Sequence, residues 1–281
     1  MLKTNVEDVL VYDVDMPDQP DIFVSAKPSL TLTQENALLR TQLQEEKEIR
    51  IKAETALLMV DSAQKNGDPP PSRMAMIVSL AKLAESRDDD TGKHLIRIRQ
   101  YTDIIAHAFA KIHPTLLPVG EVSIISAASM LHDIGKVGIS DDILLYPSTF
   151  NAKQFDEMKR HTIIGGDILL TLSEELGGDP WIDTSIQIAL SHHEKWDGSG
   201  YPFGLKNEGI NLPARIVAVA DVYDALTCER VYKKAMTHDE AVTIILLNSG
   251  KQFDPKVVNA FIAESAAIKE IKSNLINQID S

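Results

Sequence analysis

The fold is decided by residues 122–135, which read VSIISAASMLHDIG. Apolar side chains recur in this stretch at the spacing of one helix face, at Val122, Ile125, Ala128 and Leu131. The run leads directly into His132 and Asp133, and Gly135 follows at a point where helices commonly end. We therefore expect a buried helix that delivers an imidazole and a carboxylate to the interior.

The same helical signal extends over most of the chain after residue 72. Another apolar face is marked by Met76, Ile77, Leu80 and Leu83. Capping residues or first-turn prolines predict further helices that begin near Asn151, Pro213, Thr237 and Asp254. The first of these helices is expected to continue through His161, and the third to close at Gly250. No strand has an obvious place here, so the sequence predicts an all-α fold.

Residues 66–71, which read NGDPPP, divide the chain because proline removes an amide donor and restricts the residue before it. We place a domain boundary there, between a small N-terminal region (1–70) of unknown function and a helical domain (71–281). Residues 6–24 predict short strands or loops, and residues 33–64, which lack proline and glycine, predict a long charged helix. Its apolar seam does not sustain a heptad, so a homodimer through this helix and a lone connecting helix are both open.

The composition narrows the class of protein. The chain has 281 residues, 44% of them hydrophobic, and a formal charge of -13, so a substantial core is expected. Binding to DNA or RNA is not expected, because no cluster of Lys and Arg is present to replace counterions. The single cysteine, Cys228, excludes an intramolecular disulfide. No signal segment or membrane-spanning run is found, and we expect a cytoplasmic protein without a membrane partner.

Imidazole and carboxylate side chains of the kinds that bind metal ions accumulate in the helical domain. They are His132, Asp133, His161, His192, His193 and Asp221. Any one of them alone is more often a hydrogen-bonded core residue, but their combination in one domain favours a metal centre. Because the set contains imidazole and carboxylate but no thiolate, it suits iron, manganese or zinc ions. It is a poor match to a structural zinc site.

Helix geometry bears on how these side chains bind. Consecutive side chains diverge by about 100°, so His132 and Asp133 are not expected to aim at one ion in parallel. A carboxylate can instead bridge two ions that lie about 3.5–4 Å apart. We therefore expect Asp133 to bridge two divalent ions, one of them bound by His132.

The other ligand types follow apolar helix faces. The apolar face of the helix before the histidine pair predicts that His193 is the residue that points inward. Fraying of the helix end, or the next loop, can instead turn both His192 and His193 inward. Asp221 follows the run 215–220, which is apolar from Ile216 onward, and is expected to point into the core. An ion there would offset the cost of burying an unpaired carboxylate.

Three stretches taken together resemble a known family. They are LHDIGK at 131–136, HHEKWDGSGYP at 192–202 and ARIVAVADVYDAL at 214–226. In this order they are similar to the HD-GYP subgroup of the HD phosphohydrolase superfamily, over about residues 72 to 262. Members are all-helical bacterial phosphodiesterases that open cyclic di-GMP at a site with two, sometimes three, metal ions. The resemblance implies an HD-type helical bundle, a cyclic dinucleotide substrate and two divalent ions, with iron or manganese favoured and zinc also compatible.

The resemblance also implies residue roles. The metal ligands would be the six residues named above, and Asp133 and Lys136 would act in catalysis. Asp88 would contact a guanine and His94 would line the site. In three-metal members a glutamate stands four residues before this histidine; Asp90 occupies that position here and puts a third ion in doubt. Basic residues that hold substrate phosphates in the family match Lys136, Arg230 and Lys233.

The loop 198–202, which reads GSGYP, predicts a tight turn with Tyr201 at its tip. From the residues alone, a ring that packs on the core and a ring that touches substrate are both open. The resemblance favours a lid over the site that contacts substrate, and a surface on residues 200–202 for signalling partners such as diguanylate cyclase domains. Two residues depart from the family: Asn207 replaces a glycine, and Val231 replaces a proline.

The expected chemistry follows from charge. Two ions bridged by Asp133 would lower the pKa of a shared water, and the resulting hydroxide would attack phosphorus. The ions and Lys136 would neutralise charge on the phosphate oxygens. The alternatives are a weakly active cyclic di-GMP sensor that signals through protein partners and a phosphohydrolase for another nucleotide. The complete ligand set favours hydrolysis over sensing, and the loop favours cyclic di-GMP over another nucleotide.

Overall fold

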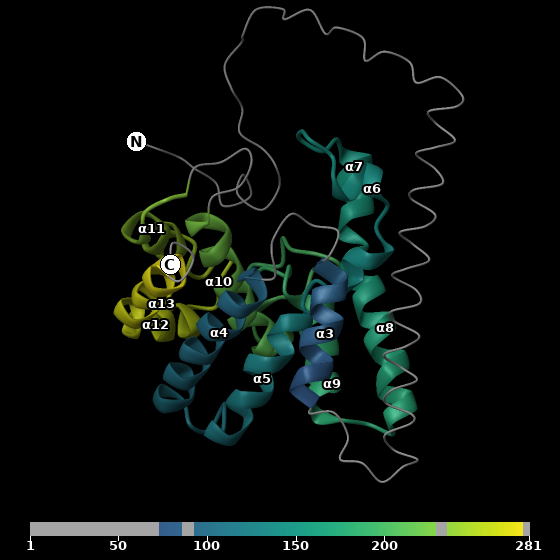
Figure 1. The fold of residues 1–281 in the computed structure, drawn as a ribbon. Helices are drawn as coiled ribbons and strands as arrows, with labels where there is room; N and C mark the ends of the chain where they lie inside the picture. The colour runs from purple at the N-terminus through teal and green to yellow at the C-terminus, as the bar shows by residue number, and fades with distance from the viewer. Residues whose placement is uncertain (1–72, 86–92, 229–234, 278–281) are drawn as a thin grey trace, which may run out of the picture. The chain divides into compact units, whose positions relative to one another are not determined.

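The computed structural model describes residues 73–85, 93–228 and 235–277. Within these ranges helices and short 3₁₀ turns form all the regular structure, and the only β pairing is an isolated bridge between Ser249 and Phe253 (Figure 1). The predicted all-α fold is confirmed. No helix in the described ranges combines the length and apolar character needed to cross a bilayer.

Some predictions fall outside the described residues. These are the strands or loops at 6–24, the charged helix at 33–64, the boundary near residue 70, and the side chains of Asp88, Asp90, Arg230, Val231 and Lys233.

The α-helices are labelled as in Figure 1. They are α3 (Arg73–Glu85), α4 (Lys93–Ile112), α5 (Val122–Ala128), α6 (Asp141–Leu144), α7 (Ala152–Lys159), α8 (His161–Leu176), α9 (Pro180–Ser191), α10 (Leu212–Thr227), α11 (His238–Leu247), α12 (Pro255–Ala263) and α13 (Ser265–Asn277). The 3₁₀ turns are η1 (Val119–Glu121), η2 (Ser129–Leu131), η3 (Ile134–Gly138) and η4 (Asn207–Gly209).

Local sequence signals explain where several helices begin. A reciprocal capping box opens α7, in which the side chains of Asn151 and Gln154 each accept a hydrogen bond from the other's backbone N–H. Thr237 and Glu240 do the same for α11. A proline lies in the first turn of α10 and of α12, as predicted.

The helix expected to run from residue 151 through His161 is interrupted. The N–H of Arg160 donates to the carbonyl of Glu157 at 3.1 Å, a three-residue bond that tightens the turn between α7 and α8. The prediction of one continuous helix was therefore wrong. The break puts His161 in the first turn of α8, where the residue is only 2% exposed.

A large apolar core among the described residues lies between α4, α5, α10, α11, α12 and α13. Helix α10 is central to it, because it packs against α4, α9, α11 and α12. The rings of Tyr101 and Tyr223 meet edge to face inside this core, with centroids 5.0 Å apart. Burying each large side chain of this kind contributes about 1.5–3 kcal/mol. The core thus holds α4 and α10, which carry His94 and Asp221, in a fixed relation.

A second close contact joins η3, α8 and α9 through glycines. A Cβ atom at Gly135 would overlap the carbonyl of His161 and the amide of Gly165, and one at Gly166 would overlap the side chain of Leu190. The backbones therefore approach to a distance that only glycine permits. This approach brings Asp133, the first turn of α8 and the end of α9 together.

Candidate metal centre

The six metal ligands predicted from the sequence, together with His94, meet in two adjoining groups. One group holds Asp133, His161, His192 and His193, and the other holds His94, His132 and Asp221. In each group one candidate ligand atom from every residue lies within 4.8 Å of the others. Segments far apart in the chain supply these atoms, from α4 to α10.

Asp133 lies between the two groups. Its Oδ1 is 3.3 Å from Nε2 of His161 and 3.5 Å from Nε2 of His192. Its Oδ2 is 3.4 Å from Nε2 of His132 and 2.9 Å from Nζ of Lys136. The two oxygens of one carboxylate thus face different sets of imidazoles.

Backbone carbonyls orient three of the imidazoles. Nδ1 of His132, His161 and His192 donates to the carbonyls of residues 129, 158 and 188, at 2.9, 2.7 and 3.0 Å. A carbonyl only accepts, so Nδ1 carries the proton and each Nε2 presents a lone pair. These three Nε2 atoms are buried without a hydrogen-bond partner, as is Oδ1 of Asp133.

Buried polar atoms without partners are costly and need an explanation. Here the orphaned atoms are lone-pair donors that belong to the two ligand groups, and nitrogen and carboxylate oxygen are the donor types that iron, manganese and zinc accept. The arrangement therefore fits divalent metal ions.

The protonation states also suit ligands. Burial lowers the pKa of His132, of His193 and of His161, the last to about 4, so these imidazoles are neutral near pH 7. Burial raises the pKa of Asp133, but the ammonium of Lys136 and the nearby imidazoles outweigh burial and hold the pKa of this carboxyl well below its usual range.

His94 has a different environment. Its Nδ1 is 2.7 Å from Oδ2 of Asp224, and its Nε2 lies 4.0 Å from Oδ1 of Asp221 and 3.9 Å from Oε1 of Glu85. Burial lowers its pKa, yet the bond to Asp224 and the surrounding carboxylates raise the pKa to about 9. The ring is therefore charged in the ion-free protein, and an ion bound at Nε2 would displace that proton.

Sequence reasoning missed three residues beside this group. They are Glu85, Arg97 and Asp224; Arg97 Nε donates to Asp224 Oδ1 at 2.6 Å. A signal was present for two of them, because Arg97 and Asp224 each lie one helical turn beyond a recognised site residue, His94 and Asp221. Nothing local marked Glu85, which only the packing of α3 brings to the site.

The structure decides between the two orientations left open for the histidine pair. Both rings turn toward Asp133 because α9 ends at Ser191, and His192 is the more buried of the two, at 3% exposed. Asp221 points inward as expected, with its side chain 13% exposed, and it faces imidazoles rather than apolar side chains.

The loop after α9 brings an aromatic ring to the site. Tyr201 lies flat on His193, with centroids 4.7 Å apart and planes inclined by 27°, and meets Phe155 of α7 edge-on. Further along, Asn207 has a φ of 53°, in the left-handed region. The resemblance led us to expect glycine at this position, and asparagine is among the few other residues that adopt such a φ readily.

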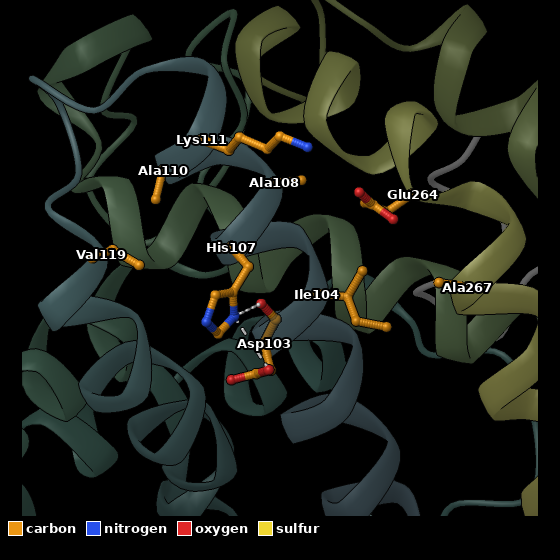
Figure 2. Close-up of a pocket in the computed structure, with 9 residues that line it drawn as sticks. All are labelled: Asp103, Ile104, His107, Ala108, Ala110, Lys111, Val119, Glu264 and Ala267. Carbon is orange, nitrogen blue, oxygen red and sulfur yellow. Dashed lines mark hydrogen bonds and ion pairs between the residues drawn. The ribbon is translucent and has the colours of Figure 1, made fainter.

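The described residues also form a hollow away from this centre. It has a volume of about 510 Å³ and is lined largely by α4, with Asp103, His107 and Lys111 on one side and Glu264 on the other (Figure 2). His107 bonds within its own helix, to the carbonyl of Asp103 at 2.9 Å. None of the predicted site residues lines this hollow.

The HD-domain family model matches residues 79–257, a range that contains both ligand groups. The chain belongs to the HD-GYP group of HD-domain proteins. This HD-GYP chain is 42% identical over 226 residues to a probable cyclic di-GMP phosphodiesterase of Vibrio cholerae. It is 41% identical over 235 residues to a cyclic di-GMP phosphodiesterase, and 34% over 200 residues to 3'3'-cGAMP-specific phosphodiesterase 2, both of the same organism.

The three alignments cover 79%, 83% and 71% of this HD-GYP chain, and 51%, 48% and 36% of the relatives. The chain thus spans about half the length, or less, of these curated relatives.

Proposed function

We propose that this HD-GYP chain hydrolyses a phosphodiester bond of cyclic di-GMP at a centre of two divalent metal ions. The observation that carries the proposal is the set of buried, partnerless Nε2 atoms arranged on both sides of Asp133. One ion would be held by Asp133, His161, His192 and His193. The other would be held by Asp133 together with His132 and Asp221, with His94 beside it.

The protein's own groups are prepared for this chemistry. When bound, the ions supply an acidified water as nucleophile and positive charge at the phosphate oxygens. Asp133 is ionised, so each of its oxygens is available to a different ligand group. The side chain of Lys136 is 22% exposed beside Asp133, from where its ammonium reaches both the carboxylate and a phosphate that approaches from solvent.

The substrate class rests on the relatives. The two relatives above 40% identity are named for cyclic di-GMP, and another is named for 3'3'-cGAMP. A cyclic dinucleotide is therefore the proposed substrate, cyclic di-GMP is favoured, and cGAMP hydrolysis is the second candidate. Guanine and phosphate contacts by Asp88, Tyr201, Arg230 and Lys233 belong to the same proposal.

Three further statements remain predictions. They are a cytoplasmic location, a homodimer through residues 33–64, and docking of a signalling protein on residues 200–202.

The test is turnover by the full chain loaded with manganese or, without oxygen, with ferrous iron. Chromatography of the products from cyclic di-GMP and 3'3'-cGAMP measures both activities. We expect faster hydrolysis of cyclic di-GMP. Asp133→Asn should reduce it by at least about 10³-fold because it removes the charged ligand proposed for both ions. The matched control is Asp103→Asn on α4, a half-exposed carboxylate outside the site, which should keep wild-type activity.

The outcomes separate the alternatives. Tight binding of cyclic di-GMP by the metal-loaded wild type without product would favour the sensor. Faster turnover of 3'3'-cGAMP would favour the second candidate, and comparable turnover of unrelated nucleotides would contradict a cyclic dinucleotide specificity.

A further inference from the structure

His193 is held differently from the other histidines of the two groups. Each of the others donates Nδ1 to a carbonyl or a carboxylate, whereas no hydrogen bond to the His193 ring occurs within the described residues. Three ring contacts surround it instead. Two are with other candidate ligands: His161 meets it edge to face at 5.1 Å, and His192 lies 4.0 Å away with its plane inclined by 42°. The third is with Tyr201, which stacks on it with centroids 4.7 Å apart.

Neighbouring groups hold Tyr201 in place. The backbone N–H of Tyr201 donates to the carbonyl of His193 at 3.2 Å. The ring of Phe155 in α7 meets the Tyr201 ring edge to face, with centroids 5.9 Å apart and planes at 85°. Aromatic pairs in such geometries contribute about 0.5–1.5 kcal/mol beyond their burial. The ring of Tyr201 can therefore orient the imidazole in place of a hydrogen bond if the loop that carries it is fixed.

A buried carboxylate fixes that loop. Glu194 is 3% exposed, and its Oε1 accepts the N–H of Phe203 at 2.7 Å while its Oε2 accepts the N–H of Leu205 at 3.0 Å. Hydrogen bonds to charged groups are worth about 1.5–3 kcal/mol each. Between these contacts, a Cβ at Gly200 would overlap the backbone of residues 194 and 195, so the loop returns directly over the segment that carries Glu194.

We propose that Glu194 and Tyr201 are positioning residues for the metal ligand His193. Glu194 holds the loop through its backbone, the loop holds the tyrosine ring, and the ring holds the imidazole so that its lone pair faces Asp133, His161 and His192. This inference rests on the proposed metal centre. It assigns Tyr201 a role that is separate from the substrate contact expected of it, and it gives the buried Glu194 a function.

The first test is the affinity of the full chain for Mn²⁺, measured without substrate by competition with a chelator. Loss of a group that orients a metal ligand typically costs about 10–100-fold in affinity. Tyr201→Leu removes the ring and should bind Mn²⁺ that much more weakly, whereas Tyr201→Phe keeps the ring and should stay within about twofold of wild type. If Tyr201 also contacts substrate through its hydroxyl, Tyr201→Phe raises KM while metal affinity is retained.

A double-mutant comparison tests whether the effect passes through His193. Tyr201→Leu should weaken Mn²⁺ binding in the wild-type background and change nothing further in a His193→Ala background. Equal losses in the two backgrounds, or wild-type affinity in Tyr201→Leu, would overturn the proposal. So would an equal loss in Tyr201→Phe, because the hydroxyl and not the stacked ring would then be responsible.

Glu194→Gln gives an independent variant if Tyr201→Leu does not fold. An amide can accept only one of the two N–H bonds, so Mn²⁺ affinity should fall in the same direction. Ser199→Ala, an exposed change in the same loop, is the matched control and should leave the affinity unchanged. Wild-type affinity in Glu194→Gln would remove Glu194 from the proposal. A wild type that binds Mn²⁺ as expected but hydrolyses no cyclic dinucleotide would defeat the proposed function and leave this inference intact.

Discussion

His161 carries an imidazole that the fold keeps neutral. Burial is the largest cause, and it lowers the pKa from 6.5 to about 4. Between these values the unfolded chain binds more protons than the folded chain, so the free energy of unfolding decreases as pH falls from 6.5 toward 4. For this single group the loss approaches about 3 kcal/mol.

Urea unfolding of the ion-free protein from pH 6.5 to 4.5 measures this effect. In that window Asp133 and Asp224 stay ionised, because their pKa values are lowered, and His94 stays protonated in the folded chain, because its pKa is about 9. Wild type should lose stability more steeply than His161→Asn. A residual slope is expected from His132 and His193, whose pKa values are also lowered. Identical slopes in both proteins would show that His161 is not the group that titrates.

Asn207 is a residue other than glycine in a left-handed backbone conformation. Its φ of 53° lies in the left-handed region, which costs a side chain about 1–2 kcal/mol unless the residue is glycine or a short polar residue such as asparagine. Asn207→Gly should therefore be nearly neutral, and Asn207→Val should destabilise the protein by about 1–2 kcal/mol. Thermal unfolding of the two variants distinguishes them, and equal melting temperatures would contradict the assignment of strain to this position.

At the scale of elements, glycines let η3, α8 and α9 approach one another. Gly135→Ala would place a methyl group on the backbone of α8 at His161 and Gly165. Neither backbone can move without displacing Asp133 from His161, so we expect a stability loss of at least about 1–3 kcal/mol and weaker Mn²⁺ binding. The control is Gly120→Ala in η1, where an added Cβ meets nothing within 4 Å. Calorimetric unfolding and the chelator competition measure the two effects; equal behaviour of the two variants would contradict the close contact.

Some element boundaries followed from local sequence and others did not. The capping boxes of α7 and α11 and the first-turn prolines of α10 and α12 are local signals, because the groups that satisfy the first backbone amides lie within four residues. The break between α7 and α8 has no such signal. The break lies where η3 packs on the first turn of α8. Helical periodicity cannot predict this contact, because it joins residue 135 to residue 161.

At the scale of the molecule, the candidate ligands come from α4, the chain around η2 and η3, α8, the end of α9, and α10. Ions that bind only the folded chain would stabilise it by about 2.7 kcal/mol at a hundred times their Kd. We expect chelation to lower the melting temperature of the wild type by several degrees. Asp133→Asn should show a much smaller shift, since it removes the carboxylate proposed to bind both ions. A chelator-independent melting temperature in metal-loaded wild type would contradict the centre.

The sequence by itself determined the helical class, the starts of α7, α10, α11 and α12, the family and the residue types available as ligands, because periodicity, capping and motif order are read from neighbours along the chain. Only the tertiary structure decided which atoms meet. It set the two oxygens of Asp133 toward different imidazoles, turned His192 as well as His193 inward, and brought Glu85 and Asp224 to His94. The physical reason is that these contacts join residues far apart in sequence, and their geometry depends on how closely α8, α9 and α10 pack around the site.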